Sequence, residues 1–226
     1  MAEHIYGLFE NDTNKRLIER LKKRQANLRL FPDVTAIAPA LEPAAAPHFD
    51  LSASDWIVFP DLYSVDFFLA TITEKFALDE LTVCALGDSI SDRLRFSQVH
   101  ADIIPPDRQT STILSSLTAY SSLPGLRLLI PVCLGEIPAV AKVLRENGAG
   151  VQLLPVYEIA YIQNAPRFTT LFRSGAVDEF IFTSPQDVFS FAYFIEPALA
   201  QLEAAATDEI TFNTLREFGI QPRMYQ

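Results

Sequence analysis

The sequence predicts an α/β protein built from two similar units. Segments typical of strands alternate with segments typical of helices along the chain, and most strand segments are continuous apolar runs. Such runs are typical of parallel strands that are covered on both faces of their sheet. The second observation is a repeat within the sequence, which indicates that one α/β unit occurs twice.

The repeat is a constant spacing between matching residues. Pro32 in the segment 27–38 (NLRLFPDVTAIA) matches Pro155 in the segment 150–161 (GVQLLPVYEIAY), 123 residues later. The same spacing joins Leu21 to Leu144, Asp55 to Asp178, Phe59 to Phe182 and Val65 to Val188, and a spacing of 121 residues joins Ala85 to Ala206 and Leu94 to Leu215. Because the spacing persists across both kinds of segment, we interpret it as an internal duplication.

The predicted strands are short runs of mainly apolar residues. They cover 3–8, 28–38, 55–59, 81–86, 101–106, 127–132, 150–161, 178–184 and 204–207. The stretch 39–49 (PALEPAAAPHF) has the composition of a linker, because proline and alanine dominate it.

The predicted helices follow from apolar periodicity and from end signals. They cover 14–25, 62–72, 89–96, 108–120, 136–148, 168–174, 185–202 and 209–218. We expect Asp12 or Thr13 to cap the first, Ser89 or Ser91 to cap the third, and a Thr or Ser to cap the helix at 108–120. Gly148 and Gly219 are expected to end helices, and Pro185 to occupy a first turn.

Composition excludes several classes of function. The chain of 226 residues is 49% hydrophobic, enough for a substantial core, and its net charge of −10 argues against a nucleic-acid partner. It shows no secretory signal and no apolar run near the roughly 20 residues that span a bilayer, so we expect a cytoplasmic protein without a membrane partner.

No motif for a metal, nucleotide or flavin is evident. Cys84 and Cys133 lie in apolar runs without a CxxC pair, and the three histidines are scattered. We therefore expect buried structural thiols in a reducing compartment, no metal site and no cofactor. A P-loop, a GxGxxG, a GxSxG and an HExxH are all missing from the sequence.

The loops that follow strands are where a ligand should bind, since open parallel sheets bind ligands at the carboxyl ends of their strands. Thr183 and Ser184 come between a strand and a helix, and offer two hydroxyls and free N–H groups that suit a carboxylate or phosphate. The alternative is a helix cap without a ligand. Tyr157 places a hydroxyl on the long strand, and its alternative is a core tyrosine with a buried partner.

At these residues the sequence resembles the uroporphyrinogen-III synthase family. The most specific segments are GAGVQLLPVY, which ends at Tyr157, and VDEFIFTSP, at 177–185. With the repeated order of elements, the resemblance extends over essentially the whole chain.

The resemblance implies a fold, a domain division and a reaction. It implies two flavodoxin-like parallel-sheet domains joined by a two-stranded linker, one formed by 1–35 with 161–226 and the other by 36–160. The family cyclises hydroxymethylbilane, a linear tetrapyrrole with eight carboxylates, to uroporphyrinogen III. Water is lost and the last pyrrole ring is inverted through a spiro intermediate, without metal or cofactor. We expect a monomer.

The resemblance also implies roles for individual residues. Tyr157 matches a tyrosine thought to assist departure of the hydroxyl, and a phenol with an ordinary pKa of about 10 is protonated at neutral pH. Thr183 and Ser184 match hydroxyls that face the cleft, and Thr211 matches the second threonine of a Gly-Pro-Thr-Thr turn. Ser89 is a further substrate-binding candidate. Main-chain N–H groups at helix starts would hold carboxylates, with help from arginines such as Arg93, Arg108 and Arg167.

The sequence departs from the family pattern at several loops. Pro60-Asp61-Leu62 stands where the family has Thr-Ser-Pro, and this places a carboxylate near a polyanionic substrate. Val132-Cys133-Leu134 replaces a polar turn, and Asp208-Glu209-Ile210 replaces a Gly-Pro-Thr turn ahead of Thr211. A diverged member without activity, or a two-domain binder of a small anionic ligand, is the alternative function.

Overall fold

The computed structural model describes residues 4–11, 14–32, 35–37, 49–72, 75–160, 177–195 and 203–225. Its contacts divide the chain into two compact units, Met1–Thr35 with Ala160–Gln226 and Ala36–Ile159. We call these the terminal unit and the middle unit. Each has a five-stranded sheet. Every strand pair whose residue-by-residue pairing is described is parallel. The predicted α/β class with parallel sheets is therefore confirmed.

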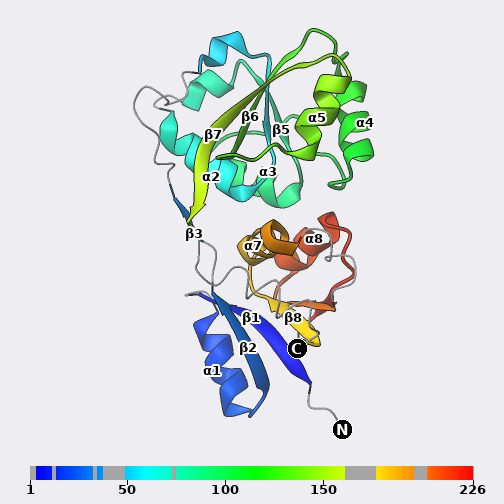
Figure 1. The fold of residues 1–226 in the computed structure, drawn as a ribbon. Helices are drawn as coiled ribbons and strands as arrows, with labels where there is room; N and C mark the ends of the chain where they lie inside the picture. Colours follow the sequence, from blue (N-terminus) through cyan, green and yellow to red (C-terminus); the bar gives the residue numbers. More distant parts are fainter. Residues whose placement is uncertain are drawn as a thin grey trace. The chain divides into compact units, whose positions relative to one another are not determined.

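The terminal unit is a sheet with helices on both faces (Figure 1). The strand order is β10-β9-β8-β1-β2, and the helices are α1, α7 and α8. The strands are β1 (Ile5–Glu10), β2 (Asn27–Pro32), β8 (Glu179–Phe182), β9 (Ala204–Ala206) and β10 (Arg223–Met224), and the helices are α1 (Lys15–Lys23), α7 (Pro185–Ile195) and α8 (Glu209–Glu217).

Alternation along the strands sorts the core of the terminal unit into two layers. On one face, Leu17, Ile18 and Leu21 of α1 pack against Leu8, Ile181 and Ala205. On the other face, phenylalanines dominate the layer, with contributions from α7 and α8: Phe9, Phe31, Phe180, Phe182, Phe191, Val188 and Leu215. The sheet is thus buried on both sides, as the apolar strands predict.

The middle unit also consists of a five-stranded sheet and several helices. Its strand order is β3-β7-β6-β4-β5, and an isolated parallel bridge from Cys84 to Ile103 extends the sheet beyond β5. The strands are β3 (Thr35–Ile37), β4 (Trp56–Phe59), β5 (Thr82–Ala85), β6 (Arg127–Cys133) and β7 (Gly150–Ala160), the α-helices are α2 (Leu62–Thr71), α3 (Asp88–Phe96), α4 (Thr110–Tyr120) and α5 (Ala139–Glu146), and short 3-10 helices cover Leu51–Ala53 and Lys75–Leu78.

An aspartate ties neighbouring strands together at the start of each sheet. In the middle unit, Asp55 accepts the N–H of Arg127 at 2.8 Å, and its own N–H donates to the Arg127 carbonyl at 2.8 Å. In the terminal unit, Asp178 makes the same pair of bonds with Ile5, at 2.7 and 2.9 Å. Each aspartate thereby fixes the register of the two central strands.

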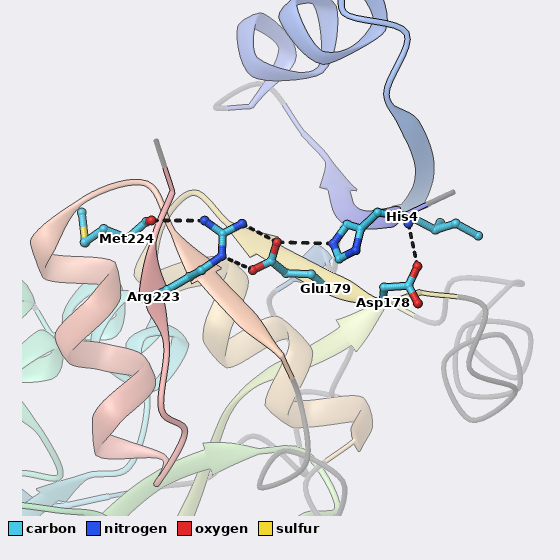
Figure 2. Close-up of polar contacts among 6 residues, drawn as sticks. His4, Asp178, Glu179, Arg223 and Met224 are labelled. Atoms are coloured by element: carbon cyan, nitrogen blue, oxygen red, sulfur yellow. Dashed lines mark hydrogen bonds and ion pairs between the residues drawn. The ribbon is translucent and has the colours of Figure 1, made fainter. Parts of the chain in front are cut away.

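An ion pair between the buried Glu179 and the half-exposed Arg223 joins β8 to β10 in the terminal unit (Figure 2). Arg223 donates two hydrogen bonds of 2.6 Å to Glu179, whose side chain is 5% exposed. His4 lies on the other side of Glu179, with Nε2 3.7 Å from the carboxylate. The intervening strand β9 carries only alanines, so the arginine side chain can pass over it.

Two predicted helix starts are wrong. Gly87, with φ of +134°, is the residue before α3, so Ser89 lies inside the helix and is buried. A glycine is required because this φ is strained for other residues. Helix α4 follows Gln109 without a side-chain cap, instead of a Thr or Ser cap.

Other predictions have different outcomes. Gly148 and Gly219 adopt positive φ just after α5 and α8, which confirms them as helix stops, while β10 was not predicted. Several predictions concern residues outside the described part of the chain: the caps Asp12 and Thr13, the helix at 168–174, most of the stretch 39–49 and the end of the helix at 185–202.

Both cysteines are free and buried, and burial raises the pKa of the Cys84 thiol to about 12.

Candidate functional site

Tyr157 lies on β7, where its ring is enclosed by aromatic residues of α2. The tyrosine is 3% exposed. Its ring centroid is 5.5 Å from that of Tyr63 and 5.9 Å from that of Phe67. Helix α2 therefore fixes the plane of the Tyr157 ring, and what remains variable is the direction of the hydroxyl proton.

Asp61 is the hydrogen-bond partner of that hydroxyl. The Tyr157 hydroxyl donates to Oδ2 of Asp61 at 3.0 Å. The other carboxyl oxygen accepts the Ser64 N–H at 2.7 Å, so Asp61 also caps α2. The Asp61 N–H donates to the Ser64 hydroxyl at 3.3 Å and completes a capping box. The carboxylate expected to disfavour a polyanionic ligand is therefore turned into the protein.

Burial shifts both groups of this pair toward their protonated forms. Desolvation raises the pKa of Asp61, against hydrogen bonds from Ser64 and Tyr157 and the charge of Arg108. Desolvation also raises the pKa of Tyr157, and the nearby Asp61, Glu136 and Cys133 raise it further. The phenol is thus protonated at neutral pH and can serve as a proton donor.

Arg108 joins the two loops beside this pair. Its guanidinium donates to the carbonyl of Pro60 at 2.5 Å and to the carbonyl of Leu86 at 2.5 Å. These carbonyls lie just beyond β4 and β5, so the arginine holds the strand-end loops together. Arg93 instead forms an exposed bidentate pair with Asp66, and Arg167 lies outside the described residues.

Thr183 and Ser184 lie between β8 and α7, as predicted, and both bond to Asp187. The N–H and the hydroxyl of Thr183 donate to Oδ2 of Asp187 at 2.9 and 2.7 Å. The Asp187 N–H donates to the Ser184 hydroxyl at 3.2 Å, and Asn11 donates to the remaining carboxyl oxygen at 2.9 Å. In this structure the two hydroxyls hold the start of the helix.

Thr211 has a similar partner at the start of α8. Its N–H and its hydroxyl both donate to Asp208 at 2.8 Å, and the residue is fully buried. Asp208 is the cap of the helix, and it follows β9, the neighbour of β8 in the sheet. Thr183, Ser184 and Thr211 therefore lie at the carboxyl ends of adjacent strands.

The five candidates divide between the two units. Tyr157 and Ser89 belong to the middle unit, and Thr183, Ser184 and Thr211 belong to the terminal unit. Sequence reasoning missed Asp61 as the partner of Tyr157, because 96 residues separate them in the chain. The local signal that could have identified Asp61 as a cap is the Asp-x-x-Ser pattern of 61–64.

The described part of the chain has neither a cluster of metal ligands nor a helix suited to cross a membrane. Its residues contain no group of three or more His, Cys, Asp or Glu side chains that could hold a metal ion. Among its helices, none is long and apolar enough to cross a membrane.

Comparisons with known proteins point to one family. The family model for uroporphyrinogen-III synthase HemD matches residues 15–225. A solved structure of Thermus thermophilus uroporphyrinogen III synthase is similar, with 18% identity, a TM-score of 0.61, and coverage of 96% of this chain and 91% of that chain. A mutant form of the enzyme from the same organism gives 17% identity, a TM-score of 0.62, and coverage of 97% and 90%. A search of curated proteins finds no significant match.

Proposed function

We infer that this chain, which belongs to the uroporphyrinogen-III synthase family, is a uroporphyrinogen-III synthase that cyclises hydroxymethylbilane with loss of water and inversion of the last pyrrole ring. The observation that carries this function is the family match over residues 15–225. The matched range includes Tyr157 and the loops at the starts of α7 and α8. Formation of the type III isomer from hydroxymethylbilane tests it.

We propose that Tyr157 supplies the proton that the departing hydroxyl needs. Loss of hydroxide from a hydroxymethyl group is slow, and protonation by a positioned acid converts the leaving group to water. Like any phenol of ordinary or raised pKa, Tyr157 holds its proton at neutral pH and has one to give. Its fixed ring supports a defined position, because the aromatic side chains of α2 restrict it.

We propose further that main-chain N–H groups at helix starts bind substrate carboxylates. Helix N-termini attract anions through free N–H groups and through the helix dipole. Thr183, Ser184, Thr211 and Ser89 remain our candidates for substrate binding. The positions of Thr183, Ser184 and Thr211 at the starts of α7 and α8 support this role, since side chains that shape a helix start also aim its free N–H groups. Ser89 lies in the first turn of α3.

The acidic character of the chain is compatible with an anionic substrate on this view. The Asp61 carboxyl bonds to the Tyr157 hydroxyl inside the protein and has a raised pKa, so it presents little charge to a ligand. A cytoplasmic location and a monomeric state belong to the same proposal and stay predictions.

We also propose that the two units are duplicated domains joined by two connecting segments. The chain passes between the compact units twice, at 35–36 and at 159–160, close to the predicted limits of 35 and 160. The matching aspartate ties of Asp55 and Asp178 support duplication, since these residues show the 123-residue spacing.

The strand orders support the same proposal. In the terminal unit, β2, β1, β8, β9 and β10 follow one another across the sheet, and in the middle unit β7, β6, β4, β5 and the Ile103 bridge do so. Both correspond to the flavodoxin-like order 2-1-3-4-5. Strand 1 of that order is β1 in the terminal unit and β6 in the middle unit, where the chain enters the order instead at β4, its strand 3.

A further inference from the structure

We propose that Asp61 is the positioning residue of Tyr157, and that its carboxyl proton replaces the one that Tyr157 gives to the departing hydroxyl. The inference rests on the proposed function of the chain. It assigns a role to a residue that stands out in the sequence only as a departure from the family pattern.

The geometry gives Asp61 one oxygen for the helix and one for the tyrosine. Oδ1 accepts the Ser64 N–H, and Oδ2 lies 3.0 Å from the Tyr157 hydroxyl. Residues of α2 enclose the Tyr157 ring, and Asp61 caps that same helix. A single element therefore places both the ring and the partner of its hydroxyl.

The protonation state of Asp61 decides where the tyrosine proton points. When Asp61 is a carboxylate, it accepts the Tyr157 proton, and the hydroxyl has no proton to give a ligand. When Asp61 is protonated, its O–H donates to the phenol oxygen, and the Tyr157 proton is free to point to a substrate. Tyr157 acts as an acid in the second state only.

The proton balance closes over one turnover. The C–O bond of the hydroxymethyl group breaks with its electrons on oxygen, and the Tyr157 proton converts that oxygen to water. The Asp61 proton then moves to the phenolate. Ring closure releases one proton from a pyrrole carbon when the ring regains aromaticity, and that proton restores the Asp61 carboxyl. No oxidant or other reactant is needed.

The charged and titratable groups around the pair come from several elements. Arg108 favours the carboxylate form of Asp61, and its guanidinium is held by the carbonyls of Pro60 and Leu86. Cys133, which ends β6, and Glu136, in the turn after it, favour the protonated phenol, and the tilted ring of Tyr63 lies beside it. Burial of the Asp61 carboxyl outweighs the effect of Arg108 and favours the protonated carboxyl.

The test compares Asp61→Asn, Asp61→Ser and the unchanged chain. Asparagine and serine both cap helices well, so α2 keeps its cap in either variant. Asparagine can still donate to the phenol oxygen but holds no transferable proton, and serine is too short to reach it. We expect kcat of Asp61→Asn to fall roughly 10-fold to 100-fold, and that of Asp61→Ser to fall further.

Two pH profiles separate this role from a structural one. In the unchanged chain, kcat should fall as pH rises through the ionisation of Asp61, and Asp61→Asn should lose that limb. Without substrate, the ring-carbon NMR signal of Tyr157, assigned with Tyr157→Phe, should shift over the same pH range in the unchanged chain and stay constant in Asp61→Asn.

Each result has a defined meaning. An alkaline limb that persists in Asp61→Asn, or a Tyr157 signal without pH dependence in the unchanged chain, overturns the proposal. A chain that forms no type III isomer but keeps the pH-dependent signal overturns the proposed function instead, while the coupling of the two side chains stands. If Asp61→Asn does not fold, Asp61→Ser serves for the same comparison of pH limb and NMR signal.

Discussion

Carboxylates accept the hydroxyl protons of three of the five predicted site residues. Tyr157 donates to Asp61, Thr183 to Asp187 and Thr211 to Asp208. In each case the partner is the cap of a helix or lies in its first turn. The hydroxyls could be predicted from the sequence, but their partners could not, because the same residues suit a ligand and a cap equally well.

Replacement of Tyr157 by phenylalanine tests the residue proposed as the proton donor. We expect kcat to fall roughly 10²-fold to 10⁴-fold, the usual contribution of a general acid, because the departing hydroxyl loses its proton source. Stability should fall by about 1 kcal/mol, since Asp61 loses one hydrogen bond in a buried place.

The matched control is Tyr120→Phe, which removes a hydroxyl from a ring that is 55% exposed. Both variants would be compared by steady-state rates and by thermal melts. An unchanged rate for a folded Tyr157→Phe variant would remove Tyr157 from the reaction.

Gly7 is required by packing in the terminal unit. A Cβ atom at this position would lie 2.6 Å from the ring of Phe180, which is fully buried among other phenylalanines. We expect Gly7→Ala to destabilise the protein by about 1–3 kcal/mol through overpacking. The measurement is the free energy of unfolding in urea.

Gly150→Ala is the control for this substitution. Gly150 also lies on a strand, but a Cβ atom at this position would have its nearest neighbour 3.6 Å away, an ordinary contact. A Gly7→Ala variant as stable as Gly150→Ala would show that the phenylalanine layer can rearrange at little cost.

At the scale of elements, strand content could be predicted better than helix starts. The long strand β7 and the apolar strand β6 are continuous apolar runs, and the structure places them close to the predicted limits. Strand β10 has two exposed residues, so no apolar pattern marks it. The start of α3 depends on the backbone of Gly87, which two nearby serines obscured.

Arg223 anchors β10 through the buried Glu179. We expect Arg223→Ala to destabilise the protein by about 1–3 kcal/mol, because Glu179 keeps its burial and loses its partner. The lower part of this range is favoured, since Arg223 is half exposed and water can replace part of the interaction.

Arg93→Ala provides the comparison, because Arg93 makes a similar bidentate pair with Asp66 on an exposed surface. Such exposed pairs contribute at most about 1 kcal/mol. Equal losses for the two variants in urea unfolding would contradict a special role for the pair formed with the buried Glu179.

At the scale of the whole molecule, the fold class was predictable because it depends on features that repeat along the chain. Apolar strands, alternating elements and the spacing from Asp55 to Asp178 are visible without coordinates. The contact of Asp61 with Tyr157 is not, because it joins the start of α2 to strand β7, 96 residues further along the chain. For this reason the Asp61 carboxylate looked unfavourable for an anionic substrate in the sequence, where its bond to Tyr157 cannot be seen.

The function of the chain is tested most directly by the isomer that it forms. Hydroxymethylbilane would be prepared fresh and incubated with the protein, and the oxidised products would be separated into type I and type III uroporphyrins. Spontaneous closure gives type I, so a sample without protein supplies the baseline. We predict type III as the main product. Folded protein that yields only type I would contradict the assignment of this chain as an active synthase.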